Sequence, residues 1–131
     1  MQFTVMGKQR RNILLVDQDP HFRANLRLAL EEAGFTVGEA ANGKEGERTA
    51  LRIRPDAILL DLMMEEVDTG GLIAQRLREI GEKFPIYIIS GAAASMQYNF
   101  NFHDLGITGV FSKPVDVKAV IQTLKTRLKM G

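Results

Sequence analysis

Four side chains suited to group transfer stand at the ends of separate apolar runs in the sequence: Asp17, Asp61, Ser90 and Lys113. Two carboxylates that lie close together repel each other, and a hard cation such as Mg²⁺, which takes oxygen ligands, relieves that repulsion. A hydroxyl and an ammonium beside them suit a phosphoryl group, whose oxygens need positive charge and hydrogen-bond donors. Together these residue types indicate phosphoryl transfer with an aspartate as the nucleophile.

The runs that lead to these residues have the length of strands. Residues 13–16, 57–60 and 86–89 are continuously apolar, which is typical of strands covered on both faces of a parallel sheet. Weaker strands are predicted over 35–40 and 108–112. We expect the four polar residues to meet, because ligands of open α/β sheets bind beyond the carboxyl ends of the strands.

The segments between the strands carry apolar residues at helical spacing; in the first segment, Phe22, Leu26 and Leu30 fall on one face, which marks them as core residues. They predict helices over about 20–33, 44–54, 72–84, 93–105 and 117–128. Asp19, which stands before Pro20, and Asp116 are typical N-caps. Five strands and five helices in alternation predict an α/β fold, a doubly wound five-stranded parallel sheet with right-handed crossovers and helices on both faces.

The composition limits the class of protein. The 131 residues fit one domain, and the absence of cysteine excludes a disulfide scaffold, a thiolate metal site and a cysteine nucleophile. A net charge of +1 gives no overall field for nucleic acid or an anionic membrane, and no apolar run is long enough to span a bilayer. The first residues lack the order of a secretory signal. We therefore expect a soluble, cytoplasmic domain over residues 12–130 after a short tail over 1–11, with no direct binding to nucleic acid or membrane.

Four segments of the sequence resemble the receiver domain of two-component response regulators. They are ILLVDQDP (13–20), AILLDLMM (57–64), IISG (88–91) and FSKP (111–114), and they keep the family's order and approximate spacing across about residues 12–128. The resemblance implies a flavodoxin-like sheet with strand order 2-1-3-4-5. It also implies a signalling domain rather than an enzyme, which takes a phosphoryl group from a sensor histidine kinase or a phosphotransfer protein.

The resemblance implies a role for each matching position. Asp61 would accept the phosphoryl group, Ser90 would hydrogen-bond to it, and Lys113 would pair with its charge. The implied Mg²⁺ ligands are Asp17, Gln18, Asp61 and the backbone carbonyl of Met63. The peptide bond between Lys113 and Pro114 would be cis, a form that is readily adopted only before proline.

The implied output is a protein-interaction surface. It would be formed by the helix expected over 93–105, the strand over 108–112 and the last helix, and a homodimer could form through it. No DNA-binding motif follows the last helix, so either the protein acts through protein contacts alone or this sequence is part of a longer chain.

Several positions depart from the family's pattern. Gln18 stands where the family has a second acid, Glu65 where proline is common, and Val110 where an aromatic switch residue is common; we expect the neighbouring Phe111 to point into the core. Gln18 offers an oxygen without charge, which predicts weaker Mg²⁺ binding. Asp19 could compensate, but its position as a helix cap competes for the same carboxylate.

The lifetime of the phosphoryl group can also be predicted. In the family, the side chains two positions after the acceptor and two after the hydroxyl residue help to hold the hydrolytic water. Here these are Met63 and Ala92, neither of which can orient a water molecule. We therefore expect slow autodephosphorylation.

Other interpretations stay open at this point. The altered positions are compatible with a degenerate receiver that binds partners without phosphorylation. A phosphatase with an aspartyl-phosphate intermediate would usually carry a second aspartate where Met63 stands, so it ranks last. Taken singly, Asp61 could be a loop or cap carboxylate, and Ser90–Gly91 an ordinary turn.

Overall fold

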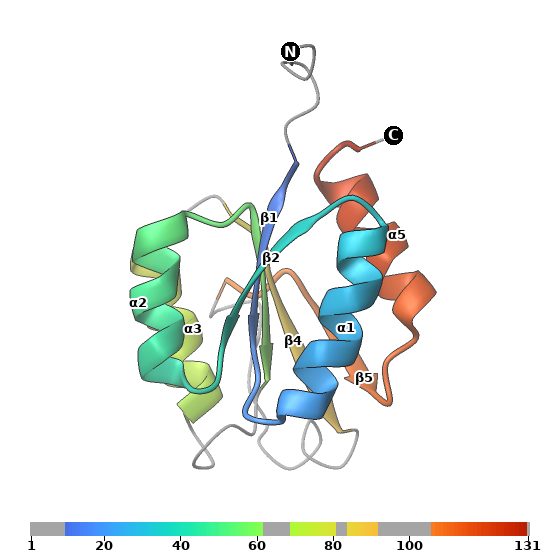
Figure 1. Ribbon diagram of the computed structural model, residues 1–131. Helices are drawn as coiled ribbons and strands as arrows, with labels where there is room; N and C mark the ends of the chain where they lie inside the picture. The colour runs from blue at the N-terminus through green and yellow to red at the C-terminus, as the bar shows by residue number, and fades with distance from the viewer. Residues whose placement is uncertain (1–9, 62–68, 81–83, 92–105, 131) are drawn as a thin grey trace.

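The computed structural model describes residues 10–61, 69–80, 84–91 and 106–130 (Figure 1). In the segment 69–80, side chains are described from residue 75 onward. A five-stranded sheet lies at its centre, and all neighbouring strands are parallel, in the order β2-β1-β3-β4-β5. The predicted strand order is therefore confirmed. The strands are β1 (Asn12–Val16), β2 (Thr36–Ala40), β3 (Ala57–Asp61), β4 (Ile86–Gly91) and β5 (Gly109–Lys113).

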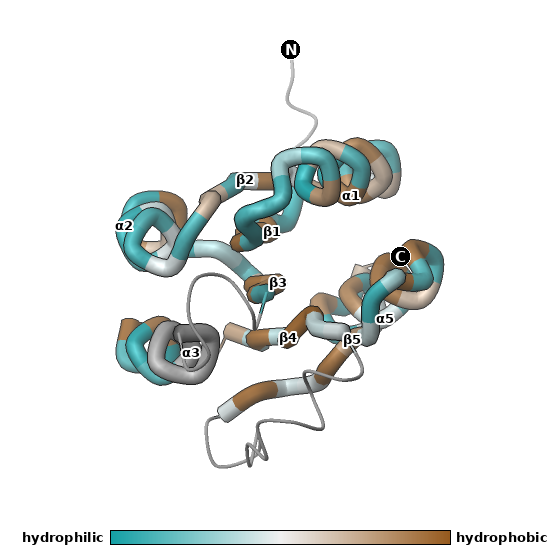
Figure 2. Tube along the Cα trace, turned by 90° about the horizontal axis from the view of Figure 1, so that it is seen from below, coloured by the Kyte–Doolittle hydropathy of each residue, from teal (hydrophilic) through white to brown (hydrophobic). Residues whose placement is uncertain are grey.

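Helices cover both faces of this sheet. They are α1 (Pro20–Glu32), α2 (Gly43–Ile53), α3 (Thr69–Ile80) and α5 (Val117–Arg127). Figure 2 shows α1 and α5 on one side of the strands and α2 and α3 on the other. The helix expected over 93–105 lies outside the described residues. Among the described helices, none has the length and apolar character needed to cross a membrane.

Alternate residues of the buried strands supply two separate cores. In β1, Ile13 and Leu15 pack with residues of α1 and α5, whereas Leu14 and Val16 pack with residues of α2 and α3. Successive side chains of a strand point to opposite faces, so a continuous apolar run serves both layers. This explains why the central strands lack the alternating pattern of a sheet with one solvated face.

The helix starts are fixed by short-range polar contacts. The Asp19 side chain accepts hydrogen bonds from the backbone N–H groups of His21 and Phe22, at 2.9 and 3.3 Å, with Pro20 in the first helical position. The Asp116 side chain accepts from the backbone N–H of Ala119 at 3.2 Å. Both predicted N-caps are confirmed, because each satisfies backbone donors that the first turn leaves without intrahelical partners.

The predicted element ends need small corrections. Asp61 ends β3, as predicted, and pairs in register with Ile89, whereas β4 continues two residues beyond its apolar run, to Gly91. The helix predicted over 72–84 begins three residues earlier than expected, and α3 is described over Thr69–Ile80; Phe84 packs against the core from the segment before β4. Phe84 stands four residues after Ile80, which is the spacing of one helical face. A residue outside the helix that packs against the core can have the same spacing, so the pattern alone does not separate the two cases.

Candidate functional site

The carboxyl ends of β1, β3, β4 and β5 meet at one edge of the sheet, the lower side in Figure 1. There the side chain of Lys113 lies between two carboxylates. Its Nζ is 2.9 Å from Oδ2 of Asp17 and 3.9 Å from Oδ2 of Asp61. The two aspartates are almost fully buried, with 1% and 5% of their surface exposed. The structure thus brings together three of the predicted site residues.

Asp17 is held through both carboxylate oxygens. Oδ1 accepts a hydrogen bond from the backbone N–H of Asp19 at 2.8 Å, and Oδ2 accepts one from Lys113. Its own backbone N–H donates to the carbonyl of Ala40 at 3.1 Å, which continues the pairing of β1 with β2 by one residue. These contacts fix the direction in which Asp17 presents its charge.

Strand register places Ser90 in the same edge. Asp61 pairs with Ile89, the residue before Ser90, and Gly91 pairs with Lys113 across β4 and β5. Ser90 itself is only 1% exposed. A buried hydroxyl thus lies one residue before the end of β4, the strand between those of Asp61 and Lys113.

The other predicted positions have mixed outcomes. Gln18 is exposed beside the site, and the carboxylate of Asp19 is engaged as the helix cap, so in this structure Asp19 does not replace the missing second acid. Met63, whose backbone carbonyl was an expected Mg²⁺ ligand, lies outside the described residues, as do Glu65 and Ala92.

The segment around Lys113 agrees with two further predictions. The Lys113–Pro114 peptide bond is cis. Phe111 packs in the core, where its ring centroid lies 5.4 Å from that of Tyr87, whereas Val110 on the same strand is 40% exposed. Phe111, the aromatic residue two positions before Lys113, therefore contributes to core packing.

The donor set at this edge fits a hard divalent cation. Two buried carboxylates and one ammonium leave a formal charge of −1, and carboxylate oxygens are ligands that Mg²⁺ prefers. Within the described part of the chain, no three carboxylate, imidazole or thiolate side chains gather into a metal site. A bound Mg²⁺ would thus rely on Asp17 and Asp61 for charge and on neutral oxygens for the rest of its ligands.

Two contacts of the site have no counterpart among the predictions from the sequence. The ring of Phe22 faces the ammonium of Lys113, with 4.4 Å between Nζ and the ring centroid, although helical spacing marked Phe22 only as a core residue. Arg23 donates a hydrogen bond from Nη1 to the backbone carbonyl of Asp17. Both residues belong to the first turn of α1, directly after the acidic turn of residues 17–19. This position in the sequence is the one indication that they could lie beside the site.

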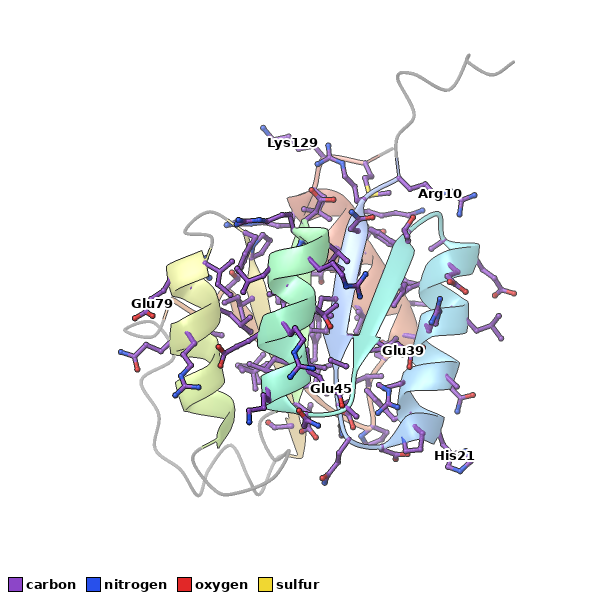
Figure 3. All side chains as sticks on the ribbon, turned by 60° about the vertical axis from the view of Figure 1, so that its left-hand side comes forward. Arg10, His21, Glu39, Glu45, Glu79 and Lys129 are labelled. Carbon is purple, nitrogen blue, oxygen red and sulfur yellow. The ribbon has the colours of Figure 1, made fainter. Side chains whose placement is uncertain are left out.

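Arg23 also ties the site to the edge strand β2. Its Nε is 2.9 Å from Oε1 of Glu39, and Nη1 of Arg27 is 2.7 Å from Oε2 of the same carboxylate. Figure 3 shows Glu39 where β2 meets α1. The hydrogen bond from Arg27, aided by that from Arg23, lowers the pKa of Glu39 in spite of its partial burial. Glu39 is therefore held as a carboxylate that orients the arginine supporting Asp17.

Replacing Glu39 with glutamine should lower the free energy of unfolding at neutral pH by up to about 1 kcal/mol, since the ion pairs are partly exposed. The lowered pKa of Glu39 means that its stabilising effect is present above the unfolded-state pKa of about 4.3 and is lost as the pH falls through the folded-state value. Urea unfolding of both proteins at neutral pH and below about pH 4 checks this. A difference that stays constant over this range would contradict it, and the exposed Glu32→Gln serves as the control.

A model of the response regulator receiver domain matches residues 13–125 of the chain. Among curated proteins, the DNA-binding dual master transcriptional regulator RpaA of Synechocystis is 33% identical over 119 residues, which cover 89% of this chain and 48% of that protein. The response regulator MprA of Mycobacterium leprae is 32% identical over 117 residues, covering 89% of this chain and 50% of MprA. The chain thus spans about half the length of these relatives.

Solved structures agree with this relationship. The chemotaxis response regulator CheY4 of Vibrio cholerae has a TM-score of 0.79 and 26% identity, and the alignment covers 90% of this chain and 98% of that one. A CheY-like receiver domain protein from Methanospirillum hungatei JF-1 reaches a TM-score of 0.82 at 19% identity, covering 92% and 95% of the two chains, and supports the fold alone. On the match that runs from residue 13 to 125, the chain belongs to the family of response regulator receiver domains of two-component signalling.

Proposed function

We propose that residues 12–130 form a receiver that accepts a phosphoryl group on Asp61 from the phosphohistidine of a sensor kinase or phosphotransfer protein. The observation that carries this proposal is the ammonium of Lys113 between the buried carboxylates of Asp17 and Asp61. Burial strengthens electrostatic interactions at such a site. An entering phosphoryl group would meet a positive charge that is already in position.

In the proposed reaction, a carboxylate oxygen of Asp61 attacks phosphorus and the phosphorus–nitrogen bond of the donor breaks. The electron pair of that bond returns to the imidazole, and a mixed carboxylic–phosphoric anhydride forms on Asp61. Lys113 offsets the charge of the phosphoryl oxygens and the hydroxyl of Ser90 donates a hydrogen bond to one of them. The domain serves as the acceptor in this reaction and does not turn over a separate substrate.

We assign Mg²⁺ to the same edge of the sheet, with Asp17 and Asp61 as the charged ligands and Gln18 and the carbonyl of Met63 as neutral ones. When bound, Mg²⁺ supplies positive charge that offsets the repulsion between the carboxylates and the phosphoryl oxygens. Because Gln18 is neutral, we expect this domain to need more Mg²⁺ than a receiver with two adjacent acids.

The output we propose is a conformational change at the face that β5 and α5 form with the helix predicted over 93–105. Ser90 and Lys113 lie at the carboxyl end of the hydrogen-bonded pair β4 and β5, so a movement of either residue toward a phosphoryl group acts on β5. Val110 of β5 is 40% exposed, so this strand offers apolar surface to a partner. We infer that a protein partner or a second copy of the domain binds there, in place of nucleic acid or membrane.

Phosphoryl uptake can be measured by intact mass after incubation with acetyl phosphate, with and without Mg²⁺. We expect a gain of one phosphoryl group that requires Mg²⁺ and is absent in Asp61→Asn. The matched control is Asp56→Asn, because Asp56 lies at the opposite end of β3 and accepts a hydrogen bond from the backbone N–H of Asn12 at 2.7 Å, which asparagine can still accept. No gain in the unaltered protein, even at high Mg²⁺, would favour a module that binds partners without phosphorylation.

Once formed, the phosphorylated protein should lose its phosphoryl group slowly. Met63 and Ala92 carry no group that could orient a hydrolytic water beside Asp61. After removal of acetyl phosphate, the mass of the phosphorylated form should persist for minutes or longer. Met63→Asn, which adds an amide at this position, should shorten that lifetime, and a half-life of seconds in the unaltered protein would contradict the expectation.

A further inference from the structure

The ammonium of Lys113 has a third neighbour besides the two carboxylates. The centroid of the Phe22 ring is 4.4 Å from Nζ. The cap made by Asp19 and the first-turn position of Pro20 start α1 directly after the acidic turn, and Phe22 follows in the first turn with its ring against the side chain of Lys113. The same short segment therefore supplies both a carboxylate and an aromatic face to one lysine.

An aromatic ring attracts an ammonium without neutralising it. The face of the ring carries the negative part of its quadrupole, and it takes no strong hydrogen bond from the cation. Lys113 can thus keep its N–H groups for Asp17 and Asp61 while the ring limits where the ammonium moves. A carboxylate in the place of the ring would instead compete for the same N–H groups.

A cavity of about 250 Å³ lies beside this pair. Its largely apolar lining includes Phe22, Leu26, Lys113, Pro114 and Val115. The side chain of Lys113 is 30% exposed, so it is partly open to solvent despite its buried partners. Without the ring the cavity would be larger, and the ammonium would have room to leave the two carboxylates.

We propose that Phe22 is a positioning residue for phosphoryl transfer: its ring holds the ammonium of Lys113 against Asp17 and Asp61, where the charge of the incoming group must be offset. This proposal rests on the function proposed above for Lys113. In the proposed reaction Phe22 acts through Lys113, whose ammonium its ring faces.

A graded series of fluorinated phenylalanines at position 22 tests the electrostatic part of the proposal. Fluorine withdraws electron density from the ring face and changes its size little, so the attraction for an ammonium weakens with each fluorine atom. From phenylalanine to the trifluorinated ring, the rate of phosphorylation by acetyl phosphate should fall stepwise, by about fivefold in all. Phe22→Tyr should keep the rate, and Phe22→Leu should lose about as much as the trifluorinated ring.

Phe35 supplies the matched control. It is fully buried in the same core cluster that Phe22 packs against, so fluorination there changes the same residue type away from Lys113. The fluorinated series at position 35 should leave the rate unchanged. A rate that does not vary along the series at position 22, or that falls equally in both series, would overturn the proposal.

A second measurement does not depend on phosphorylation. In the unaltered protein, the current of the Phe22 ring should move the NMR signals of the Lys113 ε-methylene protons upfield, and ¹³C relaxation should report a restricted side chain. In Phe22→Leu the signals should return to the range of the exposed Lys118 and the side chain should become more mobile. If acetyl phosphate fails to phosphorylate Asp61 but these shifts are found, the proposed function fails and the contact stands. Unchanged shifts and mobility in Phe22→Leu would overturn the positioning role itself.

Discussion

Methionine in place of Lys113 should slow phosphoryl transfer to Asp61 by about a hundredfold, the effect seen when one preorganised donor is removed from a developing charge. At the same time it should raise the affinity for Mg²⁺ by about tenfold, because two buried carboxylates would then lack their ammonium partner. The side chain of Lys113 lies 2.9 Å from Asp17 and 3.9 Å from Asp61, and it is their shared partner. Loss of rate and gain of metal affinity in one variant is a pattern that general unfolding would not produce.

The rate is measured by intact mass over time with acetyl phosphate at saturating Mg²⁺, and the affinity by titration calorimetry. Lys118→Met is the matched control, since Lys118 is exposed on α5. It should leave both quantities unchanged. A Lys113→Met protein that keeps the normal rate would remove Lys113 from the proposed reaction.

Alanine in place of Leu59 should lower the free energy of unfolding by about 3 kcal/mol. Leu59 lies in the third strand of the sheet order, β3, and none of its surface is exposed. The substitution removes buried methyl groups and leaves a cavity that close-packed strands on both sides cannot fill. Urea unfolding followed by circular dichroism measures the change, and the slope of the transition should stay the same.

Leu51 offers a control of the same chemistry. It is 54% exposed on α2, and leucine and alanine both favour helices, so Leu51→Ala should change the stability by less than about 0.5 kcal/mol. Equal losses in the two variants would contradict the assignment of Leu59 to the core. The comparison separates burial from the general effect of shortening a leucine.

Short-range signals in the sequence predicted the local structure well. Asp19 and Asp116 cap the helices that they precede, because a cap depends on residues only two or three positions apart. The positions of the strands followed from apolar runs to within about two residues, and the resemblance to receiver domains added the order of the strands. The meeting of Asp17, Asp61, Ser90 and Lys113 at one edge could therefore be expected before their distances were known.

Contacts between distant segments were less predictable. Helical spacing marked Phe22 as a core residue, and it does pack against the core, but nothing in the local pattern shows that its ring faces Lys113. The pairing of Arg23 with Glu39 joins α1 to β2 and has no short-range signature. Such contacts depend on how strands twist and how helices sit on them, which a pattern of polar and apolar residues does not specify.

The ion pair between Lys113 and Asp17 joins residues 96 positions apart. Lys113 ends β5, which is the last strand along the chain and lies at an edge of the sheet. During synthesis on the ribosome, the acidic residues emerge long before their lysine, and distant segments of a parallel sheet pair slowly. A nascent chain that lacks β5 also lacks Lys113, and phosphodonors should therefore not phosphorylate it. Phosphorylation should begin only when the whole domain has left the ribosome.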